Sequence, residues 1–124
     1  MKAAIAPGFS ELMITVNPAG ELTREGLLNL HMPWLIAPWP EARQKGEIEV
    51  EVKGETVRAL LITLAEAYKN AGVDFVPINP RTNDMDEDYD VFINGKNYIT
   101  TPGRLDTKLE DGDKVKLKIL FWIN

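Results

Sequence analysis

The sequence contains no cysteine, one serine (Ser10) and one histidine (His31) among its 124 residues. Without cysteine, disulfide frameworks, thiolate zinc sites and cysteine nucleophiles are excluded. With one serine and one histidine, a Ser-His-Asp arrangement has a single composition, and a metal site has at most one imidazole ligand. We therefore expect a binding or carrier module and not an enzyme, and we assign no catalytic residue, cofactor or metal.

Positive charge and long apolar runs are also scarce. Fourteen basic residues against nineteen acidic ones leave a formal charge of −5, the wrong sign for neutralising nucleic-acid phosphates. The apolar start of the chain stops at Pro7, which is short for a signal-peptide core, and no stretch approaches the roughly 20 apolar residues that span a bilayer. These absences predict a cytoplasmic protein with no nucleic-acid or membrane partner, and the length fits one hydrophobic core.

The clearest element is an amphipathic helix over Thr56 to Ala71. Its apolar residues recur at helical spacing on one face. The Thr56 hydroxyl is suited to accept a hydrogen bond from an amide of the first turn, and Gly72 is suited to the left-handed conformation just past the last turn. The expected helix is about four turns long.

Strict alternation of apolar and charged residues predicts strands at 47–53 and 114–119, the second continuing inward through Phe121 and Ile123. Residues 89–93 and 96–99 flank Asn94-Gly95, a dipeptide that tolerates the positive φ angles of a tight hairpin. Residues 12–16 and 27–32 are further candidate strands, and a long apolar loop with Trp34 and Trp39 comes after them.

The order of these elements predicts an α+β domain in which one main helix packs on one face of a mixed sheet of four to five strands. We expect the domain to span residues 27–124. Residues 1–26 are expected to form an N-terminal extension packed on it.

Four segments together resemble the ubiquitin-like β-grasp domains of the MoaD/ThiS sulfur-carrier family: residues 47–54, 56–61, 91–95 and 109–115. The most specific is Leu109-Glu110-Asp111-Gly112-Asp113-Lys114-Val115, a turn in which Gly112 relieves a tight backbone and two aspartates can bond nearby amides. The resemblance implies a carrier of molybdopterin or thiamine biosynthesis. In that family, a ubiquitin-activating-type ATPase adenylates a C-terminal Gly-Gly carboxylate, which becomes a thiocarboxylate sulfur donor.

The sequence departs from that family at its end, which reads Leu120-Phe121-Trp122-Ile123-Asn124 with no glycine after Gly112. We therefore expect a non-catalytic, sulfur carrier-like protein that works by protein–protein interaction. The alternatives are a genuine sulfur carrier whose Gly-Gly tail lies outside this sequence, and a small-ligand binding module with the Pro33 to Pro40 loop as a pocket wall. The expected partner is a ubiquitin-activating-type ATPase, a cofactor-synthesis enzyme or a second copy of the chain.

The outward positions of the last strand change from lysines, ending at Lys118, to the large apolar residues Leu120 and Trp122. This change predicts a partner-binding surface, although Trp122 covered by another part of the chain explains it equally well. His31 is the remaining partner-binding candidate, and the alternative is an ordinary surface histidine.

Five carboxylates lie within the seven residues Asp84 to Asp90. Tyr89 stands where a calcium loop needs glycine, and Gly95 stands where it needs a bidentate glutamate, so we expect a solvated acidic loop. The alternatives are a weaker cation site and a docking patch for a basic partner. Arg81 is a candidate for binding an anion.

Overall fold

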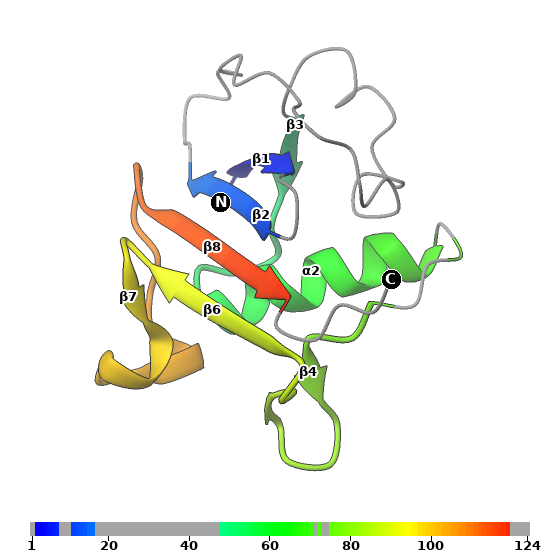
Figure 1. The fold of residues 1–124 in the computed structure, drawn as a ribbon. Coiled ribbons are helices and arrows are strands. Elements are labelled where there is room, and N and C mark those ends of the chain that lie inside the picture. The colour runs from blue at the N-terminus through cyan, green and yellow to red at the C-terminus, as the bar shows by residue number, and fades with distance from the viewer. Residues whose placement is uncertain (1, 8–10, 17–47, 71, 73–74, 120–124) are drawn as a thin grey trace.

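A computed structural model of the protein describes residues 2–7, 11–16, 48–70, 72 and 75–119 (Figure 1). The helices are α2 (Val57–Asn70) and two short 3-10 turns, η2 (Tyr98–Thr100) and η3 (Arg104–Asp106). The strands are β1 (Lys2–Pro7), β2 (Glu11–Val16), β3 (Ile48–Glu51), β4 (Ile78–Asn79), β5 (Asp84–Met85), β6 (Tyr89–Ile93), β7 (Lys96–Asn97) and β8 (Lys114–Ile119).

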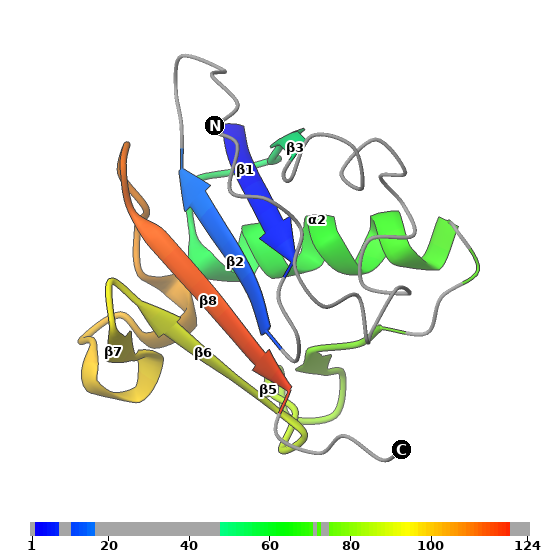
Figure 2. The same ribbon diagram turned by 45° about the horizontal axis from the view of Figure 1, so that its top comes forward.

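Six strands form one sheet in the order β3-β1-β2-β8-β6-β7, and β4 and β5 form a separate small pair. The helix α2 runs across one face of the larger sheet, behind the strands in Figure 2. The described part of the chain is therefore α+β with one main helix, as the sequence predicts. The last described strand, β8, lies in the middle of the sheet between β2 and β6.

The expected mixed sheet of four to five strands is wrong in two respects. In the described ranges the sheet has six strands, and every strand pair is antiparallel. Two N-terminal strands, β1 and β2, lie between β3 and β8. β1 is antiparallel to β3, and it would run parallel to β8 if the two strands were neighbours. Because β2 lies between them and runs opposite to β1, β8 has an antiparallel neighbour.

Residues 2–7 and 11–16 thus belong to the sheet itself, although the sequence suggested an extension packed on the domain. The strand expected at 12–16 is confirmed as β2, whereas β1 was not predicted, because its alanines and Pro7 have little strand propensity. Its backbone is held by pairing on both sides, from Ala3 opposite Val16 and Val50. The candidate strand 27–32 lies outside the described residues.

The predicted helix is confirmed with both of its ends. The Ala59 amide donates to the Thr56 hydroxyl at 3.1 Å, and Gly72 has φ +82° with its amide donating to the Lys69 carbonyl at 3.0 Å. One face of the helix is buried against the sheet: Val57, Leu60, Leu61, Leu64 and Tyr68.

The predicted hairpin is also confirmed. Asn94 and Gly95 have φ +52° and +85°, the left-handed conformation that a tight hairpin turn requires. The second strand is shorter than expected, because the chain enters η2 at Tyr98. There the Asn97 side chain accepts a hydrogen bond from the Ile99 amide at 3.1 Å, which caps the 3-10 turn and ends the ladder.

The turn before β8 is hydrogen-bonded to the end of β2. Gly112 has φ +88°, and its amide donates to the Val16 carbonyl at 2.6 Å. The Asp113 carboxylate accepts from the Glu110 amide at 2.8 Å, as expected for an aspartate in this turn. A chain ending at Gly112 would lose β8, whose Val115 and Leu117 are in the core.

Candidate functional site

The face of the sheet opposite α2 is built by alternation along its central strands. Side chains at one set of positions are buried toward the helix: Ile14, Val16, Val91, Ile93, Val115 and Leu117. The intervening residues point to the other side, because successive side chains of a strand alternate between faces. We call this side the open face, and define it by Met13, Thr15, Phe92, Lys114, Lys116 and Lys118.

The strand register arranges the open face in three rows that cross β2, β8 and β6. In the middle row, Lys116 is paired with Met13 on one side and with Phe92 on the other. In the row on one side of the middle row, Lys118 is paired with Glu11 and Asp90. A half-buried apolar side chain therefore stands on each side of the central lysine.

The third row ends at the hairpin turn. Lys114 is paired with Thr15, and its amide donates to the Asn94 side-chain carbonyl at 2.9 Å. The Asn94 side-chain amide in turn donates to Asp113 at 3.0 Å. This side chain ties the hairpin tip to the start of β8 and closes one end of the open face.

The open face is hollowed. A depression of about 530 Å³ is lined by Met13, Phe92, Asn94, Gly95, Lys114, Lys116 and Lys118. Among the described residues that line it, the charged side chains are Lys114, Lys116 and Lys118, whereas the chain as a whole carries −5. This described lining is therefore basic, with two apolar walls, on an acidic protein.

Of the four partner-binding residues predicted from the sequence, the structure describes one. Lys118 is exposed at the rim of the depression. Leu120, Trp122 and His31 lie outside the described residues, as does the loop with Trp34 and Trp39, so their roles stay predictions.

Sequence reasoning missed the two apolar side chains of the open face. Phe92 lies between the inward residues Val91 and Ile93, so the alternation of the hairpin strand alone places it outward. Met13 is next to the inward residue Ile14 in β2, so alternation places its side chain outward as well. Their meeting on either side of Lys116 was not predictable, because it depends on which strands flank β8.

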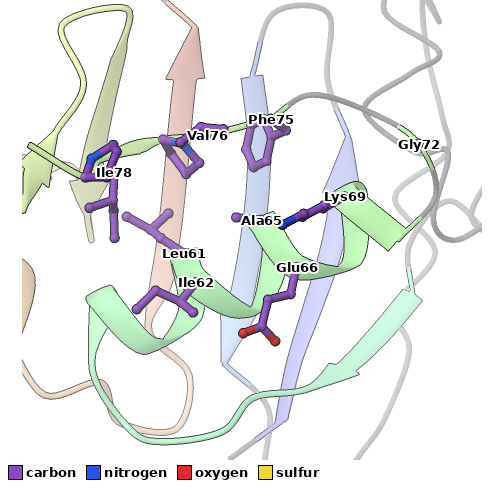
Figure 3. Close-up of a pocket in the computed structure, with 11 residues that line it drawn as sticks. Leu61, Ile62, Ala65, Glu66, Lys69, Gly72, Phe75, Val76 and Ile78 are labelled. Carbon is purple, nitrogen blue, oxygen red and sulfur yellow. The ribbon is translucent and has the colours of Figure 1, made fainter.

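A second depression, of about 660 Å³, lies between α2 and the segment 75–80 (Figure 3). Leu61 and Ile62 on the helix face Val76 and Ile78 on the segment, with Glu66 and Lys69 farther along the helix. Ile62 and Val76 are 45% and 47% exposed, which is high for side chains of this kind. We call this depression the helix groove.

A third candidate is a polar cluster at the start of α2. Arg58 donates to Asp106 at 2.9 Å and to the Asn83 carbonyl at 2.7 Å. Arg104 lies 3.8 Å from Asp84, and its guanidinium carbon lies 5.8 Å from the centre of the Tyr98 ring. Each arginine thus has a carboxylate beside it, so the cluster joins α2 and η3 to residues 83–84 and offers little charge to an anionic ligand.

Two tyrosines have altered acidity. Burial raises the pKa of the Tyr68 hydroxyl, whose side chain lies on the buried face of α2. Burial, followed by the negative charge of Asp84, raises the pKa of Tyr98. Both phenols therefore hold their protons at neutral pH and supply no anion for chemistry.

The acidic segment 84–90 is largely engaged in local hydrogen bonds. Asp86 accepts from the Asp88 amide at 3.1 Å, and Asp90 accepts from the Asn97 side chain at 2.9 and 3.0 Å. No group of three or more potential ligands able to hold a metal ion occurs in the described part of the chain. Arg81, the predicted anion ligand, is exposed.

Comparison with family models, with curated proteins and with solved structures gives no match. The resemblance to the sulfur-carrier family stays a prediction from the sequence. Within the described ranges, no helix has the length and apolar character needed to cross a membrane.

Proposed function

We propose that this chain is a non-catalytic, ubiquitin-like protein of the β-grasp type, similar to the sulfur carriers of molybdopterin and thiamine biosynthesis. In this proposal it acts by binding a protein partner through the open face and the last strand. The observation that carries the proposal is the depression of about 530 Å³ between Met13 and Phe92. Half-buried apolar side chains ringed by charged ones are typical of interface centres.

The fold supports the β-grasp part of the proposal in general terms. One helix covers one face of the sheet, a tight hairpin comes after it, and a Gly112 turn leads into a central last strand. The antiparallel pairing of β2 with β8 departs from the expected mixed sheet. The partner that the resemblance implies is a ubiquitin-activating-type ATPase or a cofactor-synthesis enzyme.

Affinity purification with quantitative mass spectrometry tests the proposal on three forms of the full chain: wild type, Phe92→Ala and Ile99→Ala. Phe92 is on the open face, and Ile99, which is 57% exposed, is the matched control on η2. We expect at least one protein to be recovered about tenfold less with Phe92→Ala and equally with Ile99→Ala. Amide NMR spectra must show that both variants keep the wild-type fold.

The proposal is wrong if Phe92→Ala and wild type recover the same proteins in equal amounts. It is also wrong if the Ile99→Ala variant loses the same protein to the same extent, because the open face would then have no special role. Incubation with an activating ATPase and a sulfur donor addresses the sulfur-carrier alternative, since a C-terminal thiocarboxylate is detected by its mass.

The helix groove favours a second candidate, the small-ligand binding module. Its size and apolar lining suit an aliphatic or aromatic molecule of low charge. Titration with a fluorescent naphthalene sulfonate probe distinguishes the two surfaces. Binding lost in Ile62→Glu and kept in Phe92→Ala would support a ligand in the groove, and the reverse result would exclude it.

A further inference from the structure

The tip of the hairpin between β6 and β7 carries a chemically reactive pair of residues. Asn94 is the one asparagine of the sequence that precedes a glycine. Asparagine is thermolabile, because the backbone nitrogen of the next residue can attack its side-chain carbonyl carbon. Glycine has no Cβ to obstruct that attack. Both Asn94 and Gly95 are exposed to solvent, which supplies the water that the reaction needs.

The reaction is a deamidation through a cyclic imide. The Gly95 backbone nitrogen forms a bond to the Asn94 side-chain carbonyl carbon and loses its proton, and the bond from that carbon to the side-chain nitrogen breaks. The departing nitrogen takes up the proton and leaves as ammonia. Water then opens the imide at either of its carbonyl carbons, and the product is aspartate or isoaspartate with a new carboxylate.

The folded turn holds Asn94 in a geometry that does not react. The φ angles of +52° at Asn94 and +85° at Gly95 are those of a type I′ turn, in which ψ of the first of these residues is about +30°. At that ψ, the Gly95 nitrogen and the Asn94 Cβ lie on opposite sides of the Cα–C bond, whereas closure of the imide ring needs them on the same side. The hairpin must therefore open before Asn94 deamidates.

Hydrogen bonds to the start of β8 hold Asn94 in this unreactive arrangement. Its side-chain amide donates to Asp113 Oδ1 at 3.0 Å, and its side-chain carbonyl accepts from the Lys114 amide at 2.9 Å. The backbone amide of Asn94 also donates to the Lys114 carbonyl at 2.8 Å. Because opening breaks these bonds, the rate of deamidation depends on how often the hairpin separates from β8.

We infer that Asn94 is a modification site at which deamidation makes this opening irreversible. The new carboxylate has no proton to donate, so it meets Asp113 Oδ1 as a like charge in the place where the amide donated a hydrogen bond. Isoaspartate also adds a carbon atom to the backbone of a tight turn. The modified hairpin therefore closes less readily, and the rim of the open face changes at Asn94. This inference does not depend on the proposed function.

Peptide mapping of the full chain by mass spectrometry tests the opening step. At mildly alkaline pH, conversion of Asn94 should be at least about tenfold faster in guanidinium chloride than in buffer. Asp113→Ala removes the acceptor of the Asn94 side-chain amide and should speed the reaction in buffer about two- to tenfold. The matched control, Asp90→Ala, removes the acceptor of the Asn97 side-chain amide and should leave the Asn94 rate as in wild type.

Two results would overturn the opening step: equal rates in denaturant and in buffer, or equal acceleration by the two aspartate variants. Circular dichroism must show that these variants are folded. If Asp113→Ala is unfolded, the comparison of wild type in buffer and in denaturant decides by itself.

The irreversible step is tested with Asn94→Asp, which is one of the two products. It should lower the urea midpoint of the wild-type chain. In an Asp113→Asn background it should lower the midpoint by less than about half as much, because the facing charge is removed and its oxygen is kept. Equal losses in the two backgrounds would overturn the inference. If Asn94→Asp is unfolded in buffer, recovery of the fold by Asp113→Asn supports the inference, and failure to recover it overturns it.

Discussion

Asn94 joins the hairpin turn to the start of β8 at the rim of the open-face depression, so its substitution tests how this part of the fold is held together. Its φ of +52° is left-handed. Its side chain accepts from the Lys114 amide at 2.9 Å and donates to Asp113 at 3.0 Å. One residue thus carries a conformational requirement and two hydrogen bonds, and two substitutions separate them.

Asn94→Ala removes both hydrogen bonds and places a Cβ-bearing residue without polar compensation in the left-handed region. Each exposed hydrogen bond contributes about 0.5–1 kcal/mol, and the left-handed conformation costs alanine about 1 kcal/mol. We expect the free energy of unfolding to fall by about 2–3 kcal/mol. Asn94→Gly loses the same bonds without the conformational cost, and should lower that free energy by about 1–2 kcal/mol.

Urea unfolding followed by circular dichroism measures both values, provided that the slope with denaturant is the same for all three proteins. Equal stability of wild type and Asn94→Gly would show that the two side-chain bonds contribute nothing. Equal stability of the alanine and glycine variants would refute the role of the positive φ.

Three further predictions concern the rest of the fold. Gly112→Ala should lower the free energy of unfolding by about 1–2 kcal/mol because of its positive φ alone. Gly54→Ala should lower it by at least about 1 kcal/mol more, because the new methyl group would lie 2.9 Å from the Ala59 methyl group of α2. Equal unfolding midpoints of the two variants in urea would contradict this prediction. Arg58→Ala should lower the free energy of unfolding by about 1 kcal/mol, because it loses a hydrogen bond to the Asn83 backbone carbonyl. Asp106→Ala should lower it by less than about 0.5 kcal/mol, because that carboxylate is 71% exposed. A larger loss for Asp106→Ala than for Arg58→Ala in the same urea assay would refute the reasoning. Because burial raises the pKa of Tyr68 above its ordinary 10.0, the folded state holds the phenol proton more tightly than the unfolded state does. The stability that comes from this proton is lost as the pH rises above about 10. Tyr68→Phe should therefore show a smaller fall in melting temperature than wild type over that pH range, and an identical fall would show that Tyr68 does not contribute to it.

The elements that the sequence predicts well are those whose signals are local. Thr56 and Gly72 mark the two ends of α2, and Asn94-Gly95 marks the hairpin, because each supplies a conformation or a hydrogen bond within a few residues. The strand β1 has no such local signal. It is stabilised by pairing with β2 and β3, and such pairing depends on residues far away in the sequence.

The open face was predictable only in part for the same reason. Alternation along β8 placed Lys114, Lys116 and Lys118 outward, and the structure confirms that orientation. Placing Met13 beside Lys116 requires β2 to be the neighbour of β8 in a particular register, and a shift of one residue would turn Met13 into the core. The depression is therefore a property of the strand order, which no single segment specifies.

The position of β8 also bears on the proposed function. Its lysines project from a strand paired on both sides, over a core that includes Val115 and Leu117. Because that backbone is already ordered, docking of a partner on the open face, as proposed, would cost little conformational entropy beyond that of the side chains. The comparison of wild type with Phe92→Ala tests whether a partner uses this ordered surface.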